Sequence, residues 1–183
     1  MISMSELLKE IGSIPDDGLD KRVVFIDVDD VIFDTTGYLR DLLRGQVCVS
    51  EYKKALSDFR KVPLLCEEDV LCTIDKWFSL NFIISYGSDD EMNSKLAVLK
   101  GILERDDISY FAVKRFLVEN RCEGIRPLSV SPVIISNDLY TVKNIWDGVY
   151  SIRVLFKSYK DRDWDGFYFS NWKNLMFLLK KLR

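Results

Sequence analysis

The sequence predicts an α/β fold in which a parallel sheet forms the core and helices flank it. Residues 22–28 (RVVFIDV) are apolar and rich in β-branched side chains, a pattern typical of a strand buried on both faces. A similar run follows much later, at residues 132–137 (PVIISN). Most of the chain between the two runs carries helix signals, and strands that alternate with helices indicate a parallel sheet.

The elements follow in order along the chain. Ser3 and Glu6 can cap a short helix, and PDDGLD at residues 15–20 predicts a turn before the first strand. From residue 35 to about 120 we expect helices alone, at 38–44, 51–60, 67–86, 88–104 and 107–120. After the strand at 132–137 we expect a helix at 139–146, strands at 150–156 and 167–169, and an amphipathic helix at 172–182. The predicted core is therefore residues 1–35 and 127–183, with an all-helical insert at 36–126.

Composition narrows the class of protein. A chain of 183 residues fits one domain with an insert, and its net charge of −3 provides no strong field for nucleic acid, which is not an expected partner. No apolar run approaches the roughly 18 residues of a membrane span, and the acidic N-terminus does not resemble a signal peptide. The four cysteines form no Cys-x-x-Cys pair, and buried free thiols suit a reducing compartment. A cytoplasmic location is expected.

The chain contains no histidine. This excludes Ser-His-Asp and Cys-His catalytic sites, and zinc sites that use histidine. Acid–base chemistry near neutral pH would fall to Asp, Glu, Lys, Tyr or Cys side chains. The composition thus favours carboxylate chemistry.

The first strand ends in a cluster of acids. Asp27 and Asp29 are two residues apart, so in extended geometry their side chains lie on the same side. Ligands of open α/β sheets bind at the carboxyl ends of strands. Two carboxylates at such an end repel each other unless a cation or a shared proton relieves them. We therefore expect a magnesium-like ion and an anionic, phosphorylated substrate.

The segment from Val24 to Thr35 (VFIDVDDVIFDT) resembles the first motif of the haloacid dehalogenase (HAD) superfamily, an apolar strand followed by Asp-x-Asp. The later run VIISN is similar to the second motif, an apolar strand that ends in Ser or Thr. The resemblance implies a Rossmann-like core with a helical cap inserted after the first motif. It also implies that Ser136 and Asn137 bind the phosphoryl group.

The third and fourth motifs match less closely. The third is a lysine, for which we prefer Lys160 while Lys157 stays open. The fourth is an apolar strand that ends in acids, but the strand at 167–169 is followed by Ser170 and Asn171. By this alignment the metal ligands are Asp27, Asp29 and the neutral Asn171, unless an upstream acid substitutes: Asp161, Asp163 or Asp165.

The resemblance implies a Mg²⁺-dependent phosphatase. Asp27 would attack phosphorus to form an aspartyl-phosphate, and Asp29 would transfer protons. A small phosphorylated metabolite or a nucleotide would be the substrate, with no membrane partner. The alternative is a catalytically impaired HAD-like domain that binds a ligand or a protein, which the missing acid of the fourth motif favours.

Overall fold

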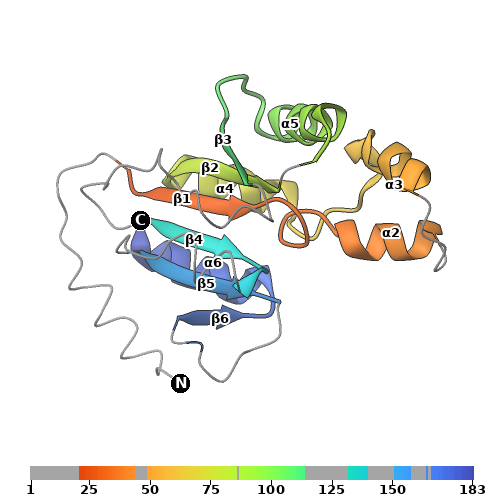
Figure 1. Cartoon of the computed structure of the whole chain (residues 1–183). Coiled ribbons are helices and arrows are strands. Elements are labelled where there is room, and N and C mark those ends of the chain that lie inside the picture. The colour runs from red at the N-terminus through yellow and green to blue at the C-terminus, as the bar shows by residue number, and fades with distance from the viewer. Residues whose placement is uncertain are drawn as a thin grey trace.

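The computed structural model describes residues 21–43, 49–85, 87–113, 132–139, 151–157, 164 and 166–183. These residues form a six-stranded sheet in the order β3-β2-β1-β4-β5-β6, in which every pairing is parallel (Figure 1). The strands are β1 (Val23–Asp27), β2 (Ser79–Ser85), β3 (Ser109–Val113), β4 (Val133–Ser136), β5 (Ile152–Phe156) and β6 (Phe167–Phe169). The predicted α/β fold with a parallel sheet is confirmed.

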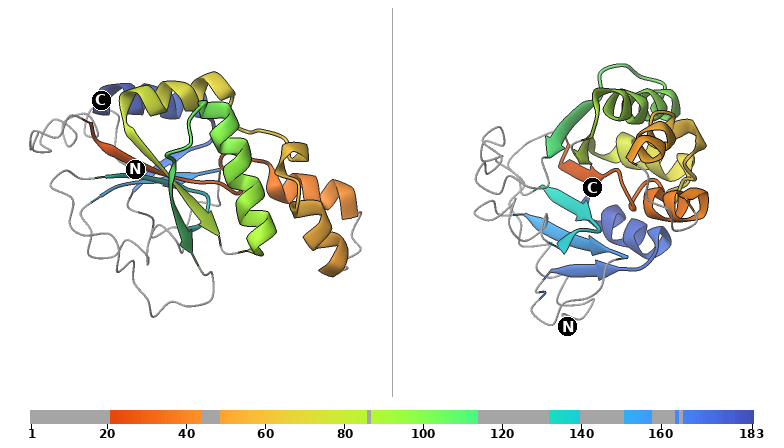
Figure 2. Two further views of the ribbon diagram at one scale, coloured as in Figure 1. Left: turned by 90° about the horizontal axis from the view of Figure 1, so that it is seen from above. Right: turned by 45° about the vertical axis from the view of Figure 1, so that its right-hand side comes forward.

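One face of the sheet is covered by α4 (Glu68–Trp77) and the C-terminal helix α6 (Trp172–Leu182), which lie next to each other in the left view of Figure 2. Alternate strand residues point to that face, because side chains alternate along a strand. The buried core joins Ile26, Phe82 and Ile135 of three neighbouring strands to Ile74 of α4 and Leu175 of α6. Phe25, Ile83 and Ile134 point to the opposite face and are buried too, and burial on both faces explains the apolar sequences of the central strands.

The remaining helices of the described chain lie near the carboxyl ends of the strands. They are α2 (Thr35–Leu43), α3 (Val49–Leu56), a short 3₁₀ helix η1 (Phe59–Lys61) and α5 (Asp89–Leu103). Figure 1 shows α2 and α3 beyond the arrowheads of β1 and β4, with α5 above them. Among the described residues, these helices thus border the carboxyl ends of the strands.

The expectation of an all-helical insert at residues 36–126 is wrong, because β2 and β3 belong to the sheet. The helix expected at 67–86 is α4 followed by β2, and β3 lies within the helix expected at 107–120. Strand pairing explains the difference. Residues of β2 pair with β1 from Val23 with Ser79 to Asp27 with Ile83, so β2 gains backbone hydrogen bonds while its apolar side chains are buried.

The strands expected at 22–28, 132–137, 150–156 and 167–169 and the terminal helix are confirmed. The helix expected near Ser3 and nearly all of the one expected at 139–146 lie outside the described residues. Among the described residues, no helix combines the length and the apolar composition that crossing a membrane requires.

Cys66 illustrates how tightly the chain packs between β1 and α4. Its side chain is fully buried, and burial raises the pKa of its thiol, with the negative charges of Asp69 and Glu67 raising it further. Because the thiolate is the reactive form, we expect Cys66 to resist alkylation by iodoacetamide in the folded protein and to react in urea. Peptide mapping by mass spectrometry measures this, and rapid alkylation of Cys66 without denaturant would contradict the packing.

Candidate functional site

The strand order creates a crevice beside β1. From β1 the chain builds outward through β2 and β3 on one side, and β4, β5 and β6 then lie on the other. Ligands of open α/β sheets bind where the strand order reverses in this way, outside the carboxyl ends of the strands. Residues that follow β1, β2 and β4 therefore meet at one place.

A tight turn follows β1 and positions its acids. The amides of Ile32 and Phe33 both donate to the carbonyl of Val28, at 3.2 and 3.1 Å. Asp30 has a positive φ of 57° within this turn, and its amide donates to the carbonyl of Phe33. Asx residues tolerate this conformation better than most. The turn buries the apolar residues of the motif and leaves Asp29 and Asp30 facing the crevice.

Asp27 is held by the neighbouring strand β4. The hydroxyl of Ser136 donates to Asp27 Oδ2 at 2.8 Å and accepts from the amide of Asp138 at 3.0 Å. Ser136 is fully buried and Asp27 is 6% exposed. The pairing of Ile26 with Ile135 sets this contact, because the next residue on each strand then lies side by side. The Ser136 hydroxyl thus links the Asp138 amide to the Asp27 carboxylate.

Asn137 lies between Ser136 and Asp138 in the chain, and the oxygen of its side-chain amide is unusual. Its Oδ1 is buried and has no hydrogen-bond partner among the described residues. A buried oxygen of this kind is available to accept a hydrogen bond or to bind a cation. Together with the carboxylates of Asp27 and Asp138, this oxygen belongs to the hard donors that Mg²⁺ prefers.

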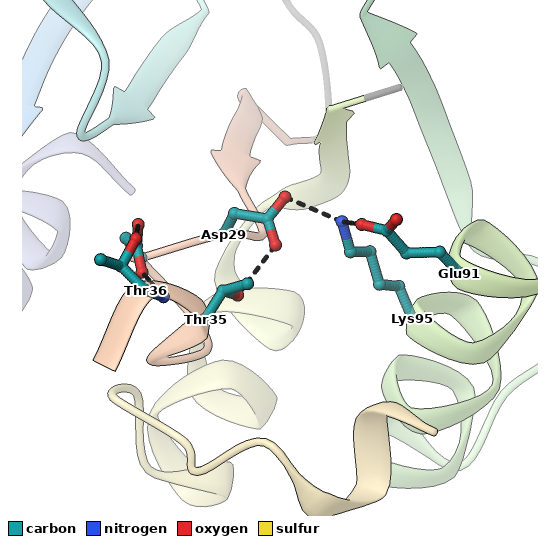
Figure 3. A network of polar contacts seen from close by, with 6 residues as sticks. Asp29, Thr35, Thr36, Glu91 and Lys95 are labelled. Carbon is teal, nitrogen blue, oxygen red and sulfur yellow. Dashed lines mark hydrogen bonds and ion pairs between the residues drawn. The ribbon is translucent and has the colours of Figure 1, made fainter. Parts of the chain in front are cut away.

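Asp29 is part of a second network, shown in Figure 3. The hydroxyl of Thr35 donates to Asp29 Oδ1 at 2.9 Å, and Lys95 Nζ donates to Asp29 Oδ2 at 2.8 Å. Lys95 also donates to Glu91 Oε1 at 2.8 Å, and its side chain has no exposed surface. Both oxygens of Asp29 are therefore held by donors from two different helices.

Burial alone would lower the pKa of Lys95, but the charges and hydrogen bonds of Asp29 and Glu91 outweigh it and raise the pKa above its usual range. The ammonium also lies 4.9 Å from the centre of the Phe59 ring, a favourable cation–π distance. Lys95 thus places a fixed positive charge inside the acid cluster.

The start of α5 fixes this cation. Ser88 caps the helix, and its hydroxyl accepts from the amide of Glu91 at 3.3 Å. Glu91 and Lys95 are four residues apart and so share one face of the helix. The sequence predicted a helix at 88–104 but did not point to Lys95, because a Glu–Lys pair at this spacing is also typical of a solvent-exposed helix face.

A cavity of about 340 Å³ opens beside Asp29. Its walls come from the turn after β1, from α2 and α3, and from the start of α5: Asp29, Asp30, Thr35, Thr36, Leu39, Val49, Tyr52, Lys53, Gly87, Ser88 and Glu91. Asp27 and Ser136 do not line it. A larger hollow of about 690 Å³ lies between η1, α4 and α5 and contains none of the predicted site residues.

The structure joins two of the predicted site residues directly, Asp27 and Ser136, while Asn137 follows Ser136 in the chain and Asp29 lies two residues beyond Asp27. It does not bring Asn171 to them, which corrects the expected place of this residue in the metal site. Asn171 follows β6, three strands from β1 at roughly 4.8 Å per strand, and its side chain caps α6 by accepting from the Asn174 amide at 2.9 Å.

The lysines expected between the last two strands are not among the described residues that contact Asp27 or Asp29. Lys160 lies outside the described residues, as do the acids Asp161, Asp163 and Asp165. Lys157 follows β5 and is exposed, with its ammonium 5.8 Å from the centre of the Phe156 ring. Within the described part of the chain, no group of three or more acidic or cysteine side chains is close enough together to hold a metal by itself.

No protein-family model matches the sequence, and the comparison with curated proteins finds no match. Solved structures do match. A haloacid dehalogenase-like family hydrolase from Xanthomonas campestris is 14% identical, with a TM-score of 0.50 over 88% of this chain and 97% of its own. The HAD-hydrolase YfnB from Bacillus subtilis, in a crystal form bound to magnesium, is 12% identical, with a TM-score of 0.56 over 87% of this chain and 98% of its own. The chain therefore has a HAD-like hydrolase fold.

Proposed function

From this fold and the contacts of Asp27 we propose that the protein is a Mg²⁺-dependent phosphatase that hydrolyses a small phosphomonoester through an aspartyl-phosphate. One observation carries the proposal. In a HAD-like fold, a buried Asp27 carboxylate is held by Ser136 at the point where the strand order reverses, and a second acid follows it by two residues.

Each acid has a distinct role in this proposal. Asp27 attacks phosphorus, and the Ser136 hydroxyl keeps its carboxylate oriented for attack. Asp29 transfers protons, first to the leaving oxygen and then from the water that hydrolyses the aspartyl-phosphate. Thr35 and Lys95 hold Asp29 in place through its two oxygens. Magnesium, when bound, would supply charge neutralisation for the transferring phosphoryl group.

The strand order also supports a different alignment with the HAD motifs. The first strand after β1 in the chain is β2, which ends in Ser85, so this residue fits the second motif. The strand β4 then fits the fourth motif, and Asp138 supplies the acid that appeared to be missing at Asn171. In this alignment Asp27, Asn137 and Asp138 hold magnesium, and Lys95 takes the role of the motif lysine in place of Lys160.

The domain division changes accordingly. We propose that α2 and α3, rather than the whole of residues 36–126, act as the cap. The cavity beside Asp29 supports this, because Leu39 of α2 and Val49, Tyr52 and Lys53 of α3 form one of its walls. The alternative of a binding module without catalysis relied in part on a missing fourth-motif acid, and an acid at Asp138 would weaken that support.

The metal site provides a direct test. Asp138→Asn keeps the shape of the side chain but removes one negative charge, so we expect roughly a ten- to hundredfold loss of Mg²⁺ affinity. Asn171→Ala, the matched control, should leave Mg²⁺ affinity unchanged while removing a helix cap. Mg²⁺ titration of phosphatase activity and calorimetry measure both. Loss of Mg²⁺ affinity in Asn171→Ala alone would favour the original alignment.

A further inference from the structure

The cavity beside Asp29 has one apolar wall. Leu39 lies on α2, and Val49 and Tyr52 lie on α3. Val49 is 66% exposed and Tyr52 is 41% exposed, although both side chains border a hollow in the protein. Apolar surface that stays exposed in a concave site gains stability when a ligand covers it. This wall therefore favours an apolar ligand group.

The opposite wall is polar, but its polar groups are largely engaged within the protein. The Asp30 carboxylate accepts from the amide and the hydroxyl of Thr36. The Asp29 carboxylate accepts from Thr35 and Lys95. Burying further hydroxyl groups against partners that are already satisfied is costly, since each hydroxyl loses its bonds to water.

Polar groups at the start of α5 are also engaged within the protein. The Ser88 hydroxyl accepts from the Glu91 amide, and Glu91 Oε1 accepts from Lys95. A sugar or another polyol bound here would thus meet, on these two walls, polar groups that are mostly bonded within the protein already.

We propose that this cavity binds the organic group of the substrate, and that this group is small and apolar or aromatic rather than a sugar. The inference rests on the proposed phosphatase function, because it places the organic group next to Asp29 while the phosphoryl group lies at Asp27. A volume of about 340 Å³ is at the lower end for ligand sites, which suits a single ring. Lys53, at the cavity wall, attracts the anionic ester.

The test compares two phosphate esters of primary alcohols, benzyl phosphate and glucose 6-phosphate, with the full chain and Mg²⁺. Both release an alkoxide-type leaving group, so a difference between them reports recognition rather than leaving-group chemistry. We expect kcat/KM to be at least about tenfold higher for benzyl phosphate.

Tyr52 provides the structural link. Tyr52→Ala should lower kcat/KM for benzyl phosphate about tenfold, mainly through KM, and should change glucose 6-phosphate hydrolysis little. Tyr52→Phe keeps the ring and should retain the benzyl preference. Tyr168→Ala is the matched control, because Tyr168 is also 41% exposed but lies on β6 at the sheet edge. Circular dichroism verifies that each variant is folded.

Binding of benzylphosphonate, which cannot be hydrolysed, separates this inference from the proposed function. If the wild type hydrolyses neither ester but binds benzylphosphonate in a Tyr52-dependent manner by ligand-observed NMR, the phosphatase proposal is overturned and the apolar site stands. If both esters are hydrolysed equally and Tyr52→Ala changes neither, the phosphatase proposal stands and the apolar site is overturned. Absence of both turnover and binding overturns both.

Discussion

Replacement of Asp27 by Asn is expected to abolish phosphatase activity, lowering kcat by at least about 10³-fold. The amide is nearly isosteric and can still accept the hydrogen bond from Ser136, so the fold should persist. It cannot form an acyl-phosphate, because it has no carboxylate oxygen to attack phosphorus. Steady-state kinetics on a phosphomonoester, with circular dichroism as the folding measurement, determine the effect.

The matched control is Asp106→Asn, since the Asp106 side chain is fully exposed and lies outside the site. This variant should retain the wild-type kcat. Equal activity in Asp27→Asn and the wild type would remove the basis for assigning Asp27 as the nucleophile.

Replacement of Lys95 by Met is expected to give the largest loss of stability, about 3–5 kcal/mol in the free energy of unfolding. Methionine fills similar space but leaves the carboxylates of Asp29 and Glu91 without their shared cation. Their side chains are only 9% and 13% exposed, so water cannot replace the ammonium effectively. Equilibrium unfolding in urea measures this change. The comparison uses the same m-value, the dependence of the free energy of unfolding on urea concentration, for both proteins.

The control for this variant lies on the same helix. Lys100 pairs with Asp106 at 3.9 Å, but the two side chains are 39% and 100% exposed. Exposed ion pairs contribute roughly 0–1 kcal/mol, so Lys100→Met should change stability little. Similar losses in both variants would contradict the view of Lys95 as a buried charge at the centre of the site.

The sequence predicted the strands whose borders are well marked. The strand β1 is a short apolar run with β-branched residues that ends in acids, and β4 follows a proline, ends at Ser136 and is followed by Asn-Asp. The acids Asp27 and Asp29 could be placed at a ligand site because a strand end in an open α/β sheet has that role in general. Parallel pairing followed from the helices between the strands.

The sequence did not reveal β2 or β3, and the missing β2 shifted the alignment of the later motifs. The segment from α4 into β2 is apolar without a Gly or Pro between them, and short apolar runs do not distinguish a strand from a buried helix. With β2 taken as helix, β4 was aligned with the second motif. The acid of the fourth motif was then sought beyond β6, where Asn171 caps a helix instead.

The burial of Lys95 could not be predicted from the sequence for a different reason. Nothing in the local sequence indicates that Lys95 rather than Lys100, the other lysine of α5, is buried, since burial depends on the packing of η1 and the turn after β1 against that helix. Lys95 becomes recognisable only when Asp29, Glu91 and Phe59 are seen around it.

Detection of the covalent intermediate tests the central claim most directly. The wild-type protein would be incubated with Mg²⁺ and acetyl phosphate, quenched in acid and reduced with borohydride, which converts an aspartyl-phosphate to homoserine. Our account predicts that peptide mapping by mass spectrometry finds homoserine at position 27 in the wild type and none in Asp27→Asn. Turnover of a phosphomonoester with no homoserine at position 27, or with homoserine at another acid such as Asp29, would contradict it.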